Sequence, residues 1–160
     1  MSYNGHMKIF KLIISLIIPF VAGSIGNLAT IPNLSGWYAA LEKPSFNPPN
    51  WVFGPVWTTL YVLMGIALWL VWISAKKHSK RRAYWLFGAQ LVLNALWSIV
   101  FFGLHAPWLA LGVLVALFVV IVATAKEFRI FSPWAAILLI PYAAWVMFAG
   151  FLNTAIAVLN

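Results

Sequence analysis

The sequence contains no cysteine and only two acidic residues, Glu42 and Glu127, among its 160 residues. Without cysteine, the chain has no disulfide, no thiol nucleophile and no thiolate metal ligand. Two carboxylates so far apart in the chain give no local pair for general acid–base catalysis. The three histidines, His6, His78 and His105, are scattered over the N-terminal end and connecting segments, so we expect no metal site.

The chain is also poor in charge, since 8% of its residues are charged and 64% are hydrophobic, a balance far from that of soluble domains. Four intervals lack Lys, Arg, Asp and Glu: residues 12–41, 44–75, 83–125 and 130–160. A transmembrane helix needs about 20 residues, so three intervals hold one span each. The third interval has 43 residues and holds two spans, divided by the turn at Gly103–Pro107.

We therefore predict an all-α fold, an integral membrane bundle of five transmembrane helices in a single domain over residues 7–160. The predicted spans are residues 9–29, 51–74, 84–104, 108–126 and 134–157. Residues 1–6 precede a second methionine, Met7, and are a candidate cloning remnant left out of the fold prediction. Lys8 and Lys11 ahead of an apolar run also suit a signal peptide. Because no clear cleavage site precedes a soluble domain, we predict that the first helix is retained.

The net charge of +8 would by itself suit a nucleic-acid-binding protein. Five spans, however, place nine of the ten basic residues on one side of the membrane and Lys43 alone on the other. Such an asymmetry marks the cytoplasmic side. We therefore predict a bacterial cytoplasmic membrane protein with its N-terminus in the cytoplasm, its C-terminus outside and no nucleic-acid partner. Binding of anionic lipid by the basic run at 76–82 is an alternative role for that segment.

Proline is concentrated just before the second span. Four prolines lie within twelve residues, and each fixes φ and keeps the preceding residue out of the α region. Residues 43–50 are therefore expected to be rigid and extended, with the next helix beginning near Trp51. We predict that residues 30–50 form a lid over a pocket. The predicted lid residues are Trp37, Pro44, Pro48 and Pro49.

Polar residues inside the spans allow two interpretations. Gln90 and Asn94 recur at helical spacing on one face, and Asn153 is an amide in the last span. An unpaired amide in hydrocarbon costs several kcal/mol, so these groups should face the bundle interior or water. They either form interhelical hydrogen bonds, worth about 0.6–2 kcal/mol each, or line a ligand pocket. Packing is favoured for Gln90 and Asn153, whereas Asn94 suits both because Trp97 lies beside it.

Seven of the ten tryptophans also fall into two groups. Those near span ends fit the aromatic belt at the membrane interface: Trp51, Trp85, Trp108 and Trp134. Trp57, Trp97 and Trp145 lie deeper, where the belt explains them less well. Tyr61 follows Trp57 at i,i+4 and shares its helix face. Large flat π faces around an apolar cavity suit a flat apolar ligand with a few polar edges.

Three stretches resemble the translocator protein family, also called the tryptophan-rich sensory proteins or peripheral benzodiazepine receptors. They are WYAALEKPSFNPP with FGPVWTTLY at 37–61, LVLNALWSIVFFG at 91–103, and PYAAWVMFAGFLN at 141–153. The resemblance implies porphyrin binding, since family members bind porphyrins, and it favours a homodimer. Mammalian members also bind cholesterol and benzodiazepine-type drugs. Here Asn153 is followed by TAIAVLN in place of the mammalian Tyr and Arg, so sterol binding does not carry over.

We therefore predict a membrane receptor or sensor for a flat hydrophobic ligand, most simply a porphyrin or other tetrapyrrole, with no obligatory cofactor and no metal. Its partners are this ligand and the lipid bilayer. The predicted ligand-binding residues are Tyr38, Trp57, Tyr61, Asn94, Trp97, Trp145, Ala149 and Leu152. Tyr61 is predicted from its spacing to Trp57, and the resemblance implies the other seven. One alternative is a transporter of tetrapyrroles or lipids. The other is a light-dependent porphyrin-degrading enzyme, in which Trp57 and Trp145 would be redox partners.

Overall fold

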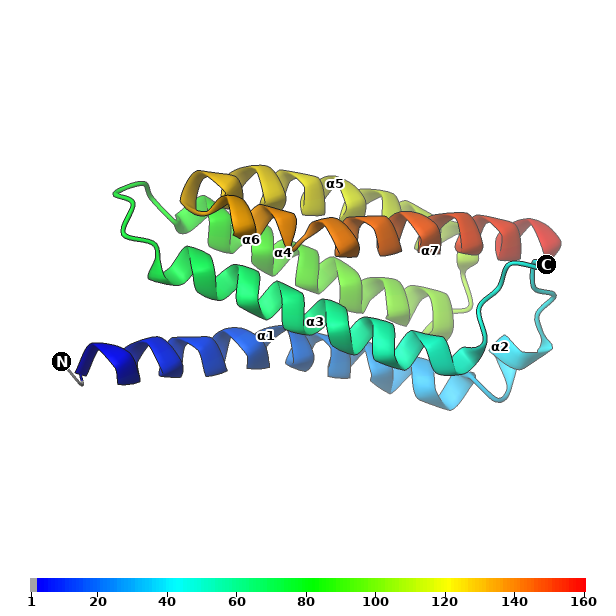
Figure 1. Ribbon diagram of the computed structural model, residues 1–160. Helices are drawn as coiled ribbons and strands as arrows, with labels where there is room; N and C mark the ends of the chain where they lie inside the picture. Colours follow the sequence, from blue (N-terminus) through cyan, green and yellow to red (C-terminus); the bar gives the residue numbers. More distant parts are fainter. Residues whose placement is uncertain (1–2) are drawn as a thin grey trace.

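The computed structural model describes residues 3–160, which form helices and connecting segments with no strand. Five helical stretches in this range are long and apolar enough to cross a membrane: Gly5–Asn33, Asn50–Ile73, Arg81–Gly103, Pro107–Phe131 and Pro133–Leu159. Figure 1 shows them side by side in an elongated bundle, with the two termini at opposite ends. The prediction of an all-α bundle with five membrane-spanning helices is confirmed.

The first two spans are α1 (Tyr3–Asn33) and α3 (Asn50–Ile73), joined by a lid that contains the short helix α2 (Trp37–Ala40). Helix α1 continues four residues beyond the predicted end, so the lid covers residues 34–49. Polar side chains in the last turns bond back to the helix. Thr30 Oγ1 donates to the Gly26 carbonyl at 3.2 Å, and Asn33 Nδ2 donates to the Ala29 carbonyl at 2.9 Å. These two side chains are thus satisfied within α1 itself.

The third span combines α4 (Arg81–Ser98) with a π-helical turn, η1 (Ile99–Gly103). The backbone N–H of Leu104 donates to the Ile99 carbonyl at 2.9 Å, five residues back. The wider turn buries both Phe101 and Phe102, two adjacent rings that a regular helix would direct about 100° apart. His105 then takes a left-handed conformation, with φ of 53°, and ends the span. The predicted span over 84–104 therefore ends in a π-helical turn instead of a regular α-helical one.

The last two spans are α5 (Pro107–Phe131) and the pair α6 (Pro133–Ile137) and α7 (Ile140–Leu159). The predicted span over residues 134–157 would place Pro141 in the interior of one helix. The chain instead breaks at residues 138–139, and Pro141 lies in the first turn of α7. A proline there costs no hydrogen bond, because the first backbone N–H groups of a helix have no intrahelical partner.

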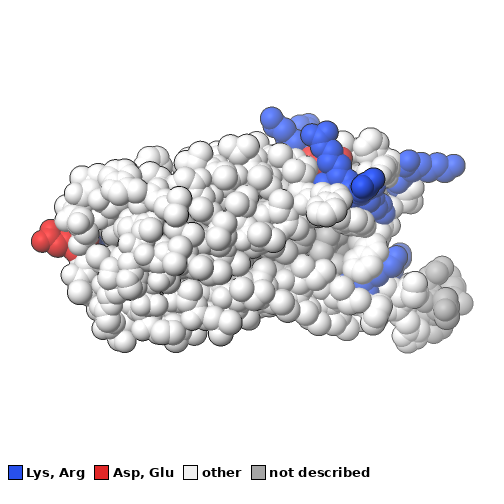
Figure 2. All heavy atoms as spheres, turned by 180° about the vertical axis from the view of Figure 1, so that it is seen from behind, with Lys and Arg blue, Asp and Glu red and all other residues white. Residues whose placement is uncertain are grey.

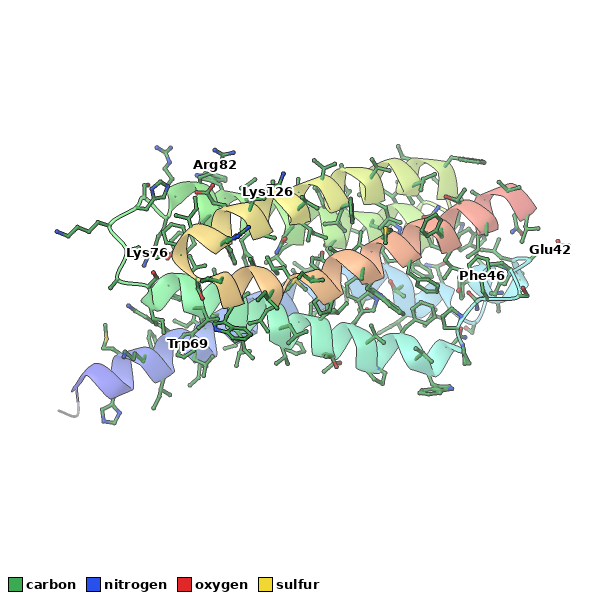
Figure 3. All side chains as sticks on the ribbon, turned by 45° about the horizontal axis from the view of Figure 1, so that its top comes forward. Glu42, Phe46, Trp69, Lys76, Arg82 and Lys126 are labelled. Carbon is green, nitrogen blue, oxygen red and sulfur yellow. The ribbon has the colours of Figure 1, made fainter. Side chains whose placement is uncertain are left out.

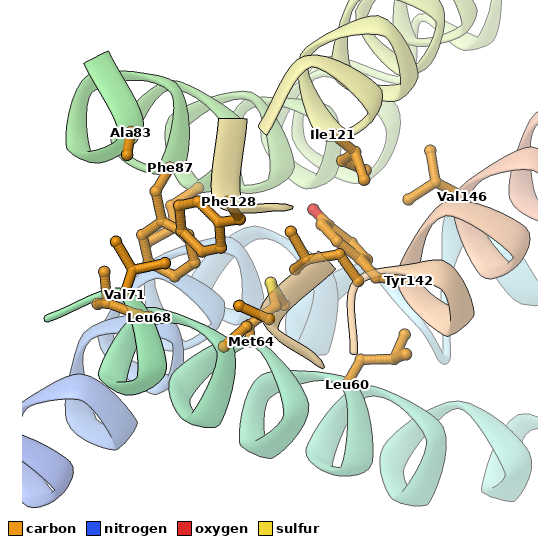
Figure 4. Close-up of a cluster of buried hydrophobic side chains, with 14 of the residues drawn as sticks. Leu60, Met64, Leu68, Val71, Ala83, Phe87, Ile121, Phe128, Tyr142 and Val146 are labelled. Carbon is orange, nitrogen blue, oxygen red and sulfur yellow. The ribbon is translucent and has the colours of Figure 1, made fainter. Parts of the chain in front are cut away.

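Apolar side chains fill the half of the bundle farther from the lid. Figure 4 shows Met64 and Val71 of α3 meeting Phe87 of α4 and Phe128 of α5. The rings of Phe87 and Phe128 stack with centroids 5.7 Å apart. Since lipid tails are as apolar as these side chains, close van der Waals packing stabilises this core more than removal from water does.

Glycines let α1 approach its neighbours closely. A Cβ atom on Gly65 of α3 would lie 2.8 Å from the Cα of Leu16, and one on Gly23 would lie 2.4 Å from the ring of Tyr61. A Cβ on Gly26 would lie 3.0 Å from Ser98 Oγ of α4. Small residues in α1 therefore serve packing within the bundle.

Basic side chains gather at the end of the bundle opposite the lid (Figure 2). Figure 3 shows Lys76, Arg82 and Lys126 at this end and Glu42 at the lid end. Arg82 Nε lies 3.6 Å from Glu127 Oε2, and Lys80 Nζ donates to the carbonyls of Trp72 and Ser74 at 2.9 and 2.8 Å. Burial, together with the charge of Lys11, lowers the pKa of Lys80. The Lys80 bonds fasten the connection between α3 and α4, and the Arg82–Glu127 pair joins α4 to α5.

Candidate ligand-binding site

A cavity of about 430 Å³ lies in the half of the bundle nearest the lid. Its walls come from α1, the lid, α3, α4, η1 and α7, and its volume falls within the range of about 300–1,000 Å³ typical of small-molecule sites. All eight predicted ligand-binding residues line it: Tyr38, Trp57, Tyr61, Asn94, Trp97, Trp145, Ala149 and Leu152. The fold thus brings these eight side chains together from four parts of the chain: the lid, α3, α4 and α7.

Aromatic rings form the largest part of the wall. Trp57 stacks on Tyr61 with ring centroids 5.6 Å apart, and Trp97 stacks on Phe101 at 5.7 Å. Both pairs have i,i+4 spacing, which places the two rings on the same face of one helix. From the opposite side, Trp145 of α7 meets Phe53 of α3 edge to face at 5.9 Å. The cavity therefore presents flat π surfaces from three directions.

Two amides at the cavity have different roles. Asn153 is committed to packing, because its Oδ1 accepts from Trp97 Nε1 at 3.2 Å and its Nδ2 donates to the Pro107 carbonyl at 2.8 Å. Asn94 lies on the cavity floor and accepts a hydrogen bond from the Tyr61 hydroxyl at 3.3 Å. Gln90 lies outside the cavity lining, with its Nε2 4.0 Å from the sulfur of Met64. Asn94 and Tyr61 are thus the paired polar groups at the inner end of the cavity.

Tyr38 anchors the lid over the cavity. Its ring is buried against Phe101 and Phe102, and its hydroxyl donates to Asn47 Oδ1 at 3.1 Å. The Lys43 ammonium lies 4.8 Å from the centre of the Tyr38 ring, a cation–π geometry. Burial raises the pKa of the Tyr38 hydroxyl, and the Asn47 hydrogen bond offsets part of that rise.

The lid has further anchors at both ends. Trp37 stacks on His105 with ring centroids 4.3 Å apart, and His105 Nε2 lies 3.1 Å from Asn33 Oδ1. At the other end, the Asn160 side chain accepts from the Glu42 backbone N–H and donates to its carbonyl, both at 3.0 Å. These contacts tie the lid to α1, to the segment after η1 and to the end of α7.

The predicted lid residues shape the segment without touching the cavity. Trp37, Pro44, Pro48 and Pro49 are not among the described residues that line it. Residues 41–49 are largely extended, as expected, but contain a turn closed by a 3.0 Å bond from Asn47 N–H to the Pro44 carbonyl. The prolines therefore hold the path of the lid, while Tyr38 and Leu34 face the cavity.

Several lining residues were not among the predicted site. They are Phe20, Gly23, Ser24, Asn27, Thr30, Ile31, Leu34, Asn50, Phe53, Gly54, Thr58, Ser98, Phe101, Phe102, Asn153 and Ile156. Three of them carried a signal in the sequence: Asn27 and Asn153 are amides in apolar spans, and Phe101 follows Trp97 at i,i+4. The α1 residues carried no other signal, because the position of α1 beside α3 depends on close packing at glycines.

Comparison with known proteins identifies the relatives of this chain. Residues 15–159 match the TspO/MBR family. The chain is 42% identical over 154 residues to the tryptophan-rich protein TspO of Archaeoglobus fulgidus, covering 96% of this chain and 99% of the relative. It is 38% identical over 139 residues to the translocator protein of Bos taurus, covering 86% and 82% of the two chains. It is 39% identical over 117 residues to the tryptophan-rich sensory protein of Cereibacter sphaeroides, covering 73% and 72%. The chain, a membrane protein with five spanning helices, belongs to the TspO/MBR family.

Proposed function

We propose that this protein is a membrane receptor for a flat apolar ligand with polar edges, of the tetrapyrrole class, held in the cavity beneath the lid. One observation carries the proposal: eight residues chosen from sequence all line a single cavity with flat aromatic walls. Stacking on such rings contributes about 0.5–1.5 kcal/mol per aromatic pair beyond the area buried. Asn94 and Tyr61 supply polar partners for the edge of the ligand.

The shape of the interior supports a receptor over a transmembrane carrier. The cavity occupies the lid half, and the other half is filled by the packed core around Met64, Phe87 and Phe128. A carrier would need that core to open. In vesicles that hold the protein, we expect protoporphyrin IX to bind without accelerated transfer into the lumen. Protein-dependent accumulation inside the vesicles would instead support the transporter.

Light-driven breakdown of a bound porphyrin is a second candidate, because Trp57 and Trp145 both face the same cavity. Indole is oxidised far more easily than benzene, so Trp145→Phe separates this activity from binding. We expect bound protoporphyrin IX to keep its absorbance equally in wild type and Trp145→Phe under illumination at equal occupancy. Rapid loss in the wild type alone would favour the degrading enzyme.

The names of two relatives, a sensory protein and a translocator protein, are compatible with ligand recognition in a membrane. The orientation follows from the charges: we propose that the basic end faces the cytoplasm and the lid faces outward. Single cysteines introduced at Ser79 and Ser45, in a chain with no other cysteine, test this directly. An impermeant thiol reagent should label position 45 from outside and position 79 only from the cytoplasm.

Titration with protoporphyrin IX tests the proposed function. The protein is held in lipid nanodiscs, and quenching of tryptophan fluorescence is followed as the porphyrin is added. We expect saturable quenching with one porphyrin per chain, and at least tenfold weaker binding for Trp97→Ala. Unsaturable quenching that matches empty nanodiscs supplemented with free tryptophan would refute the proposal.

A further inference from the structure

The seam between α1 and α3 closes over only part of its length. The two helices run antiparallel and touch where Leu16 meets Gly65 and where Gly23 meets Tyr61. Continuing at helical spacing toward the lid, the next facing positions are Asn27 with Thr58 and Ile31 with Gly54. All four of these residues line the cavity.

Exposure places the opening of the cavity at the same seam. Among its lining residues on α1 and α3, Ser24, Asn27, Ile31, Gly54 and Thr58 are all exposed, and Ile31 is 65% exposed. The lining residues on α4, η1 and α7 are buried or half-buried. A Cβ atom built on Gly54 meets no atom within 4 Å, so this point of the rim is open space.

The other routes out of the cavity are covered. Toward the aqueous end, the lid is held by the Tyr38–Asn47 bond and the paired Glu42–Asn160 bonds. Between α3 and α7, aromatic rings bridge the gap: Phe53 meets Trp145 with centroids 5.9 Å apart. Phe46 of the lid also meets Phe148 of α7 at 6.5 Å.

The side chain of Asn27 indicates which class of ligand fits the opening between α1 and α3. Its carboxamide is exposed, and among the described residues it has no hydrogen-bond partner. By contrast, the Ser24 and Thr58 hydroxyls donate to carbonyls of their own helices, each at 2.9 Å. Asn27 lies six residues before the end of α1, about 9 Å along the axis at 1.5 Å per residue. An unpaired amide at this depth costs free energy unless an amphiphile brings a polar group to it.

We propose that the opening bounded by Asn27, Ile31, Gly54 and Thr58, here called the portal, admits ligand sideways from the lipid leaflet on the lid side. This inference rests on the proposed function and narrows its ligand class to membrane-dissolved amphiphiles, with an apolar body that enters the cavity and a polar edge that reaches the interface. The portal, and not the lid, then sets the rate at which ligand exchanges.

Reversible cross-linking tests the portal. Asn27→Cys with Thr58→Cys spans the portal, and Glu42→Cys with Asn160→Cys fastens the lid to α7 as the comparison pair. A short bifunctional methanethiosulfonate joins each pair, and a reductant releases it, in a chain that has no cysteine of its own. Each protein is held in lipid vesicles, protoporphyrin IX is added, and the rate of tryptophan quenching is measured before cross-linking, after it and after reduction.

We expect the portal cross-link to slow quenching at least tenfold, with recovery on reduction, and the lid cross-link to change it less than twofold. Unchanged rates with the portal closed, or slowing by the lid cross-link alone, would overturn the inference while leaving binding intact. Absence of saturable quenching in the reduced proteins and in the wild type would instead refute the proposed function.

A matched pair of glycine substitutions gives an independent readout without cross-linking. Gly54 and Gly112 are both helical glycines whose added Cβ would meet no atom within 4 Å, so Leu at either position is compatible with the fold. Only Gly54 borders the cavity. We expect Gly54→Leu to slow porphyrin association at least threefold and Gly112→Leu to leave it unchanged. Equal rates in the two variants would contradict the portal.

Discussion

Trp97 of α4 donates its indole N–H to Asn153 Oδ1 of α7 at 3.2 Å, and Asn153 in turn donates to the carbonyl of Pro107 at 2.8 Å. One amide thus fixes the orientation of a cavity ring and joins three helices. In a bilayer no water competes for such a bond. It therefore fixes the orientation of its partners more firmly than its small net energy suggests. The aromatic wall is therefore pre-organised by a residue that lies at its edge.

Replacement of Asn153 tests this relationship. Asn153→Leu leaves the Trp97 N–H and the Pro107 carbonyl without partners, so we expect a loss of about 1–3 kcal/mol of stability and weaker porphyrin binding. Gln90→Leu is the control, because Gln90 makes only a 4.0 Å contact to Met64 sulfur and its carbonyl oxygen has no partner within residues 3–160. Unfolding in detergent micelles measures the stability of both variants. Equal losses of stability would contradict the different roles assigned to Asn153 and Gln90.

The tryptophans provide stacking surface. Phe at position 97 or 145 keeps a π face, so we expect protoporphyrin affinity to fall by about 1 kcal/mol, or about fivefold. Ala removes the ring, and the loss should be about 2–4 kcal/mol, in line with the cost of deleting large buried side chains. Isothermal titration in nanodiscs compares the four variants. Similar losses for Phe and Ala would show that the indole N–H, which Trp97 donates to Asn153, matters more for binding than the ring face.

Because α1 packs closely on α3, the effect of a Gly→Ala substitution on stability should depend strongly on its position. Gly65→Ala places a methyl group 2.8 Å from the backbone of Leu16, which cannot move aside as a flexible side chain would. We expect a destabilisation of about 1–3 kcal/mol from overpacking. Gly112→Ala meets open space and should be neutral or slightly stabilising, since Ala is the better helix former. Thermal unfolding of the two variants checks the difference, and equal midpoints would contradict the close approach.

Much of the architecture could be predicted from the distribution of charge alone. The intervals between Lys11 and Glu42 and between Lys43 and Lys76 each contain one helix that crosses the membrane. Spans are predictable because every backbone polar group in hydrocarbon must be satisfied within a helix. The side chains that meet at the cavity could also be named, chiefly because the sequence resembles the translocator protein family, and Trp97 and Asn94 are two of them.

Local departures of the backbone from regular α-helix could not be predicted from the sequence. The π-helical turn that buries both Phe101 and Phe102 depends on how α4 packs, and its residues have no distinctive composition. The portal is equally hidden in the sequence, because Asn27 and Thr58 face each other only after glycines set the register of α1 against α3. Such features arise from tertiary packing, which hydrophobic periodicity does not encode.

Titration of Tyr38 should loosen the lid at high pH. Burial raises its pKa above the ordinary tyrosine value of 10.0, so the folded lid holds the hydroxyl proton more tightly than the unfolded chain does. The stabilisation is therefore present below pH 10.0 and is lost as the pH rises through the folded pKa, because the phenolate that forms is buried away from water. A spin label on a cysteine at Ser45 should become mobile above pH 10.0 in the wild-type background. In Tyr38→Phe its mobility should not depend on pH, and identical profiles would contradict this role.

Filling the cavity tests the central claim most directly. Ala149 lines the cavity on α7, whereas Ala144 is exposed on the same helix and is not among the lining residues. We predict that Ala149→Phe weakens protoporphyrin IX binding at least tenfold, measured by the shift of the main porphyrin absorbance band in nanodiscs, and that Ala144→Phe matches the wild type. Wild-type affinity in Ala149→Phe, with the protein folded, would place the porphyrin outside this cavity and contradict the account.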